Sequence, residues 1–209
     1  MKLAGQRVLV TGTARGIGAA LAHALRGAGC EVIAATRDDA DVADPAQVAA
    51  LFDRTGPVDV LINNAAVIHE PAPLWDVPHA EWERVMSVNV LGMVSMLRAY
   101  VPAMNARGSG VVVNVSSTWG RVAAGEQSPY CASKFAVEGL TASLADEVAR
   151  GVCVIAVNPG VVATDMLATC FQADVSGYTP PSACAASLVR MLTQLDPIWN
   201  GRSLDVAGF

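Results

Sequence analysis

The chain has 209 residues, of which 53% are hydrophobic, 16% charged and only 5% aromatic. This length and composition predict one globular unit with a sizeable buried core, and they exclude intrinsic disorder and collagen-like or low-complexity sequence. The formal net charge is -5 and the 14 basic residues are scattered, so nucleic acid is not expected as a partner.

Short runs of Val, Ile and Leu alternate with longer helical patterns along the whole chain. Strands are expected at residues 7–11, 31–36, 58–63, 111–116, 152–158 and 203–206, with helices at 16–28, 45–52, 79–104, 129–149 and 181–195. The strands are apolar at nearly every position, which is typical of strands buried on both faces of a parallel sheet. The pattern predicts the α/β class: a doubly wound parallel sheet (Rossmann fold) in a single domain, residues 1–209.

Three of the expected helices are preceded by a possible capping residue and a proline. Asp44, Ser128 and Thr179 each stand directly before a proline. A capping oxygen followed by proline is typical of a helix start.

No sequence feature indicates export, a membrane span or a metal site. No run approaches about 18 consecutive apolar residues, and no signal peptide is recognised, so a cytoplasmic protein is expected. The cysteines show neither metal-ligand spacing nor an even count, and we expect reduced thiols: Cys30, Cys131, Cys153, Cys170 and Cys184.

The first expected strand leads into the sequence TGTARGIG at residues 11–18 and then into a helix. Glycines let the chain turn sharply and bring backbone N–H groups and a helix N-terminus against a pyrophosphate. A glycine pattern by itself also fits a plain tight turn, but the strand, turn and helix context favours a dinucleotide site.

Thr36 and Arg37 close the second strand, where the adenosine ribose of a dinucleotide is recognised. Arg37 and Arg15 are suited to clamp a 2′-phosphate, and Thr36 supplies a hydroxyl, which favours NADP(H) over NAD(H). Two alternatives stay open: Arg37 pairs with Asp38 or Asp39 on a solvated turn, or Asp38 holds the ribose of NAD.

Tyr130 and Lys134 share one face of the helix expected at 129–149, and Ser117 follows the fourth strand. A lysine ammonium beside a tyrosine favours the anionic phenol, which makes the pair suitable for acid/base chemistry. Taken alone, the pair also fits an ordinary helix surface.

Together with further motifs, these residues resemble the short-chain dehydrogenase/reductase family along nearly the whole chain. The shared motifs, in order, are TGxxxGxG at 11–18, NNA at 63–65, Asn89, VNVSS at 113–117, YxxxK at 130–134 and NPG at 158–160. The resemblance implies an oxidoreductase that uses NADP(H) to move hydride between nicotinamide and a carbonyl or secondary alcohol.

The resemblance also implies a catalytic tetrad of Asn89, Ser117, Tyr130 and Lys134. Tyr130 would exchange a proton with the substrate oxygen, and Ser117, which lies 13 positions earlier, would polarise the carbonyl. Lys134 would tune Tyr130 and bind the nicotinamide ribose. Asn89 would hold a water that relays protons from Lys134. Inside a long apolar helix this amide needs partners, which a helix distortion and ordered water would supply.

The resemblance places dinucleotide contacts in both halves of the chain. Asp41 and Val42 would meet adenine, and Thr164 would bond the carboxamide. The full set is Gly12, Arg15, Gly16, Ile17, Gly18, Thr36, Arg37, Asp41, Val42, Asn63, Ala65, Tyr130, Lys134, Pro159, Gly160, Val162 and Thr164.

Candidate substrate contacts come from two segments that flank the catalytic residues. The segment 166–178 is short where many relatives insert lid helices, so an open substrate mouth is expected. The candidates are Thr118, Trp119, Val122, Glu126, Gln127, Met166, Leu167 and Tyr178.

Two other functions are kept as alternatives: an NAD-dependent alcohol dehydrogenase, and a dinucleotide-sensing binding protein without catalysis. The expected partner is a small-molecule carbonyl or alcohol, with no nucleic acid and no membrane. A homodimer or homotetramer is implied by the resemblance, through helices that carry the apolar residues Met86, Met93, Leu97, Phe135, Leu140 and Leu144.

Overall fold

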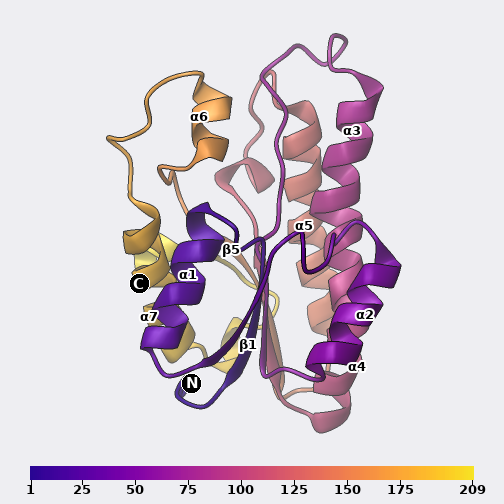
Figure 1. Ribbon diagram of the computed structural model, residues 1–209, viewed down its shortest axis with the longest axis vertical. Coiled ribbons are helices and arrows are strands. Elements are labelled where there is room, and N and C mark those ends of the chain that lie inside the picture. Colours follow the sequence, from indigo (N-terminus) through magenta and orange to yellow (C-terminus); the bar gives the residue numbers. More distant parts are fainter.

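A six-stranded parallel sheet forms the centre of the computed structural model, which describes all 209 residues (Figure 1). The strand order is β2-β1-β3-β4-β5-β6. The bounds are β1 Arg7–Thr11, β2 Glu31–Ala35, β3 Val60–Asn63, β4 Gly110–Val115, β5 Val152–Asn158 and β6 Ser203–Asp205. The four inner strands are buried almost throughout, which confirms the predicted doubly wound α/β class.

Helices cover both faces of this sheet (Figure 1). One layer holds α1 (Gly16–Gly27) and α7 (Pro181–Gln194), which pack against each other. The other layer holds α2 (Pro45–Thr55), α4 (Met93–Arg107) and α5 (Ser128–Glu147). Each layer encloses its own apolar core, with Leu21 and Leu188 in the first and Met96 and Tyr100 in the second.

The chain reverses its winding direction between β1 and β3, which are hydrogen-bonded neighbours although β2 lies between them in sequence. Helices after β1 and β3 therefore lie on opposite faces of the sheet. The carboxyl ends of these strands, at Thr11 and Asn63, open into the crevice where ligands bind in such folds.

The helix expected at 79–104 is interrupted by a π-helical turn. The observed elements are α3 (His79–Met86), the π-helical turn η1 (Ser87–Gly92) and then α4. A π turn displaces one residue from the regular ladder and is frequent at functional sites. Asn89 lies inside it, so the predicted distortion is present.

Residues 79–107 form one helical run whose length and composition would suffice to span a membrane, with mean hydropathy 1.3 over its most apolar window. Inside the protein, 44% of that window is buried, and core helices of soluble proteins meet the same criteria. Packing of α4 against the sheet accounts for its apolar residues.

One of the three predicted helix caps is confirmed and two are wrong. Asp44 accepts from the backbone N–H groups of Ala46 and Gln47 at the start of α2. Ser128 is instead the first residue of α5, and α7 begins at Pro181 after Pro180. Thr179 is not a cap because its backbone pairs with the segment at Val162.

Candidate active site

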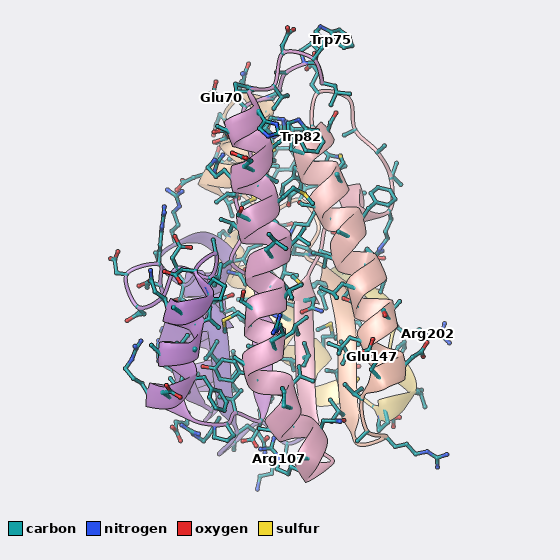
Figure 2. The ribbon with its side chains drawn as sticks, turned by 90° about the vertical axis from the view of Figure 1, so that its right-hand side faces the viewer. Glu70, Trp75, Trp82, Arg107, Glu147 and Arg202 are labelled. Carbon is teal, nitrogen blue, oxygen red and sulfur yellow. The ribbon has the colours of Figure 1, made fainter.

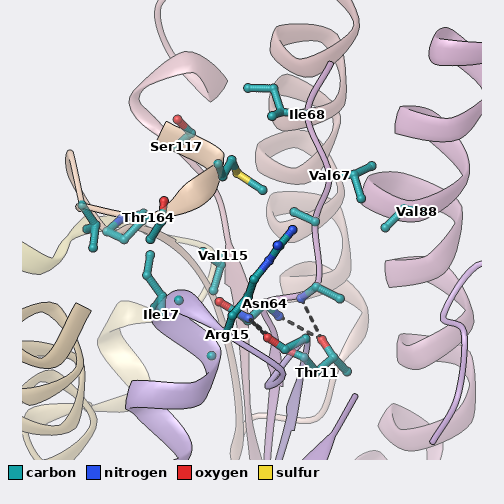
Figure 3. A pocket seen from close by; sticks show the side chains of 18 of the residues that line it. Thr11, Arg15, Ile17, Asn64, Val67, Ile68, Val88, Val115, Ser117 and Thr164 are labelled. Atoms are coloured by element: carbon teal, nitrogen blue, oxygen red, sulfur yellow. Dashed lines mark hydrogen bonds between the residues drawn. The ribbon is translucent and has the colours of Figure 1, made fainter. Parts of the chain in front are cut away.

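A cavity of about 700 Å³ opens at the carboxyl ends of the central strands (Figure 3). Its walls come from the turn after β1, the loop after β3, the end of β4, helix α5 and the segment after β5. The predicted nucleotide and catalytic motifs therefore meet in one cavity.

The glycine turn is shaped for close approach of backbone segments. A Cβ atom at Gly18 would lie 2.3 Å from the carbonyl oxygen of Gly12, and one at Gly12 would lie 2.8 Å from the Cα of Ala65. Asn64 fixes the neighbouring loop, since its side-chain amide donates to the Thr11 carbonyl at 2.8 Å and its backbone N–H donates to Oγ1 of Thr11 at 3.0 Å (Figure 3).

The N-terminus of α1 fits an anion such as the pyrophosphate of a dinucleotide. Arg15 is the N-cap residue, its side chain forms no capping bond, and no acidic residue lies in the first turn. The first N–H groups of the helix and the positive end of its dipole are thus directed at the cavity. Arg15 also pairs with Asp165 at 3.2 Å, at the start of helix α6 (Asp165–Phe171).

The adenosine end of the cavity holds basic and acidic groups side by side. The backbone N–H and the hydroxyl of Thr36 both donate to Oδ2 of Asp39, at 2.8 and 2.7 Å, and these bonds lower the pKa of that carboxyl. Arg37 is largely exposed and pairs with Asp41 at 3.1 Å. The alternative pairing of Arg37 with Asp38 or Asp39 is therefore not observed.

The catalytic candidates Ser117, Tyr130 and Lys134 line the same cavity. Nζ of Lys134 lies 5.5 Å from the centre of the Tyr130 ring and donates to the carbonyl oxygen of Val115 at 2.8 Å. The Ser117 hydroxyl accepts from the N–H of Trp119 at 3.2 Å, and the ring of Trp119 meets that of Tyr130 edge to face at 6.0 Å.

Burial shifts both titratable groups of this site toward their neutral forms. It raises the pKa of the Tyr130 phenol, an effect that the neighbouring Ser117 hydroxyl partly offsets. It lowers the pKa of Lys134 to about 8, against the opposing effect of the Glu138 carboxylate. A protonated tyrosine beside a lysine that titrates near neutrality is suited to proton transfer.

Asn89 does not line the cavity but is buried behind it, with 1% of its surface exposed. Its oxygen accepts from the N–H of Val67 at 2.8 Å, and its amide donates to the Val67 carbonyl and to Oγ of Ser133. The π turn thus ties the loop after β3 to helix α5. The predicted water relay from Lys134 stays a prediction.

Among the predicted nucleotide contacts, Asn63 is the one that does not line the cavity. Its amide donates to Oδ1 of Asn114 at 2.9 Å between strands β3 and β4. Because the Asn63 side chain points into the sheet, it bonds neighbouring strands and does not reach the nucleotide site. The next residue, Asn64, lines the cavity instead.

Four of the predicted substrate contacts line the cavity: Thr118, Trp119, Met166 and Leu167. Four others do not: Val122, Glu126, Gln127 and Tyr178. The segment after β5 forms the short helix α6, whose residues Met166, Leu167, Cys170 and Phe171 line the cavity, and the expected open mouth stays a prediction. Wall residues outside the predicted set include Ile68, Arg84, Cys170 and Phe171, which belong to no motif.

Comparisons with known proteins find related sequences over most of the chain. The family model described as short chain dehydrogenase matches residues 39–175. The "NADPH-dependent pterin aldehyde reductase" of Arabidopsis thaliana is 36% identical over 228 aligned positions, which cover 98% of this chain and 94% of the relative.

Two solved structures share the fold over nearly the whole chain. The 3-ketoacyl-(acyl-carrier-protein) reductase of Brucella melitensis, complexed with NADH, has a TM-score of 0.87 and 27% identity, covering 98% of this chain and 97% of its own. A gluconate 5-dehydrogenase of Burkholderia cenocepacia, in complex with NADP and tartrate, has a TM-score of 0.84 and 27% identity, covering 98% and 95%. On the match of the family model over more than half of the sequence and on the Arabidopsis relative, this chain belongs to the short-chain dehydrogenase/reductase family of oxidoreductases.

Proposed function

We propose that this protein is an NADP(H)-dependent reductase that acts on a carbonyl substrate. The observation that carries the proposal is the convergence of Ser117, Tyr130 and Lys134 on the cavity that also contains the glycine turn and the start of α1. The NADPH-dependent Arabidopsis relative, similar over 98% of the chain, supports this assignment.

A nicotinamide cofactor held at the glycine turn and the start of α1 would supply the hydride, and the side chains of this chain bind and protonate the oxygen of the substrate. Tyr130 donates its phenolic proton to that oxygen, which its raised pKa permits because the phenol stays protonated at neutral pH. Ser117 donates a hydrogen bond to the same oxygen and positions it. The Lys134 cation favours the phenolate that remains after proton transfer.

The substrate end of the cavity favours a flat carbonyl compound with an aromatic ring. Its wall is made largely of apolar and aromatic side chains: Ile68, Trp119, Met166, Leu167 and Phe171. Such a wall binds aromatic rings through contact area and edge-to-face packing. We therefore propose an aromatic or heteroaromatic aldehyde, a class that includes the pterin aldehyde named for the Arabidopsis relative.

Preference for NADPH is assigned to Thr36 and Arg37, which line the adenosine end of the cavity. Arg37 is exposed and able to leave Asp41 for a 2′-phosphate, since a surface ion pair contributes only about 0–1 kcal/mol. We expect Arg37→Ala to raise the KM for NADPH about tenfold and to leave that for NADH unchanged. An unchanged ratio of the two KM values would favour the NAD-dependent alternative.

The test of the proposed reaction is NADPH oxidation by the purified protein with aromatic aldehydes, ketones, keto esters and quinones. Tyr130→Phe is expected to bind NADPH normally, as measured by calorimetry, and to lose turnover by at least a thousandfold. Equal rates for the variant and the wild type would refute the role of Tyr130. Tight nucleotide binding without turnover on any substrate would favour the dinucleotide-sensing alternative.

We also propose that the protein is a cytoplasmic homodimer or homotetramer. Its α4 and α5 helices together form an apolar groove lined by residues that include Val94, Leu97, Val101, Leu140 and Leu144. Two large apolar side chains are also exposed near these helices, Leu91 in the π turn that precedes α4 and Phe135 in α5. Apolar grooves and exposed large apolar side chains are typical of a subunit interface.

A further inference from the structure

Arg121 connects the catalytic serine turn to the last strand of the sheet. It directly follows a single 3₁₀ turn, η2 (Thr118–Gly120), whose N-cap is Ser117. Its Nε donates to Oγ of Ser203 at 2.9 Å, and its Nη1 donates to both carboxylate oxygens of Asp205 at 3.0 Å. Its Nη2 donates to the carbonyl oxygen of Leu204 at 3.2 Å. All three guanidinium nitrogens are thus bonded to strand β6.

Asp205 makes a second connection, to the turn that follows β5. The side-chain amide of Asn158 donates to Oδ1 of Asp205 at 2.7 Å and to Oγ1 of Thr118 at 3.1 Å. The side-chain oxygen of Asn158 accepts from the N–H of Gly160 at 3.1 Å, and Gly160 lines the cavity. One hydrogen-bonded network therefore joins β6, the serine turn and the turn at Gly160.

The two segments that Arg121 joins are too short to fix their own positions. Strand β6 has three residues and pairs with β5 through three residue pairs, well below the five or six residues of an ordinary strand. The η2 turn also has three residues. The charge-assisted hydrogen bonds of Arg121 therefore fix the position of η2 relative to β6, which the few backbone bonds of these segments do not.

The position of η2 determines where the catalytic hydroxyl lies. Oγ of Ser117 caps this turn by accepting from the N–H of Trp119, whose ring packs edge to face on the ring of Tyr130. A displacement of η2 therefore moves the serine hydroxyl and the aromatic wall relative to the tyrosine. Misplacement of a reacting group by about 1 Å lowers rates by about a hundredfold.

We propose that Arg121 and Asp205 are positioning residues, which hold the Ser117 turn and the turn at Gly160 in fixed register across the cavity. Neither residue lines the cavity, so both act through the groups they hold. The expected effect on catalysis rests on the proposed reductase function. The expectation that Arg121 and Asp205 hold residues 116–122 in one conformation does not.

The variants are Arg121→Met, Arg121→Lys, Asp205→Asn and the double variant Arg121→Met/Asp205→Asn. Arg107→Met is the matched control, because Arg107 also bridges separate segments through bonds to Val58 and Ser109, but lies at the end of the molecule opposite Trp75 (Figure 2). Both arginines are about one-third exposed, at 30% for Arg121 and 38% for Arg107.

Two properties of each variant are measured at pH 7. Glu138 lies 3.5 Å from Arg121 and raises the pKa of Lys134, so the variants can alter that pKa. At pH 7, below the Lys134 pKa of about 8, the lysine stays charged. The first is steady-state reduction, with kcat separated from KM and with the Kd for NADPH. The second is hydrogen exchange of the peptide 116–122 by mass spectrometry, which needs no substrate.

Arg121→Met is expected to lower kcat 10- to 100-fold, to change the Kd for NADPH less than threefold and to speed exchange of residues 116–122. Arg121→Lys should recover part of kcat, because its ammonium still reaches one acceptor. The loss of kcat in the double variant should be smaller than the product of the two single losses, since Arg121 and Asp205 share their hydrogen bonds. The control should match the wild type in both readouts.

The proposal would be overturned if residues 116–122 of Arg121→Met exchanged hydrogen as slowly as in the wild type, or if its kcat lay within twofold of the wild-type value. Equal losses of kcat in Arg107→Met would also overturn it. If Arg121→Met does not fold, the milder Arg121→Lys and Asp205→Asn face the same criteria. A wild-type enzyme that reduces no substrate would refute the proposed function, while the exchange measurement would still decide the positioning role.

Discussion

At the scale of single residues, burial opposes the charge of Lys134, whereas hydrogen bonds from Thr36 favour the charge of Asp39. Lys134 is 3% exposed, and burial lowers its pKa to about 8. Asp39 is an exposed carboxylate that binds the N–H and hydroxyl of Thr36, at the position where we expect the cofactor phosphate. Each of these two charges predicts a measurable effect on function.

The first prediction concerns the pH dependence of reduction. Lys134 is charged below its pKa of about 8 and loses its proton as the pH rises through that value, whereas Tyr130 stays protonated. We expect kcat/KM for reduction to be flat near neutrality and to fall above about pH 8.

Glu138→Gln tests whether Lys134 causes this fall of kcat/KM at alkaline pH, called the alkaline limb below. Removing the carboxylate that raises the pKa of Lys134 should move the limb to lower pH. Glu147→Gln, an exposed change on the same helix (Figure 2), should leave the limb in place. An identical limb in both variants would assign it to another group.

The second prediction concerns nucleotide choice. The Asp39 carboxylate occupies the Thr36 donors and repels a phosphate, so Asp39→Asn should tighten NADPH binding about fivefold, which corresponds to about 1 kcal/mol, without changing NADH binding. Calorimetric titration with both nucleotides measures this. Asp38→Asn removes the same charge without those bonds, and an equal gain there would show that only net charge matters.

At the scale of elements, the π turn η1 brings the segment before α4 against the adenosine side of the cavity. A Cβ atom at Gly92, the last residue of this turn, would lie 2.7 Å from Cγ2 of Val42, and Val42 lines the cavity. The close approach of two segments therefore depends on the absence of one side chain.

The third prediction is that Gly92→Ala pushes the loop at Val42 into the cavity. We expect about tenfold weaker NADPH binding and a loss of about 1–3 kcal/mol in the free energy of unfolding, as is typical of overpacking. Gly139→Ala is the control, because its Cβ would meet nothing within 4 Å and alanine is favoured in a helix by about 1 kcal/mol. Normal NADPH binding by Gly92→Ala would contradict the close-packing argument.

At the scale of the whole molecule, the two helical layers differ in what they expose. The α4 and α5 side carries the apolar groove that we assign to a subunit interface, with a volume of about 260 Å³. Val94 lines this groove without belonging to either core cluster, so it allows the surface to be altered with little effect on the core.

The fourth prediction is that Val94→Arg dissociates the oligomer, because a long cation would fill the apolar groove and lose its hydration in the interface. Light scattering coupled to size exclusion should show a monomer at a concentration where the wild type is a dimer or tetramer. Val122→Arg, at an exposed apolar position away from the groove, should leave the mass unchanged. A monomeric wild type would refute the interface.

The sequence by itself determined the strand and helix order, the parallel sheet and the catalytic motif. Apolar runs report burial on both faces, and Tyr130 and Lys134 share a helix face whatever surrounds them, because these are properties of local periodicity. The tertiary structure decided which residues reach the cavity. Asn63 turns into the sheet, the short segment after β5 folds into α6, and Arg121 meets Asp205 across 84 positions. Contacts between distant segments depend on how the layers pack, which no local pattern records.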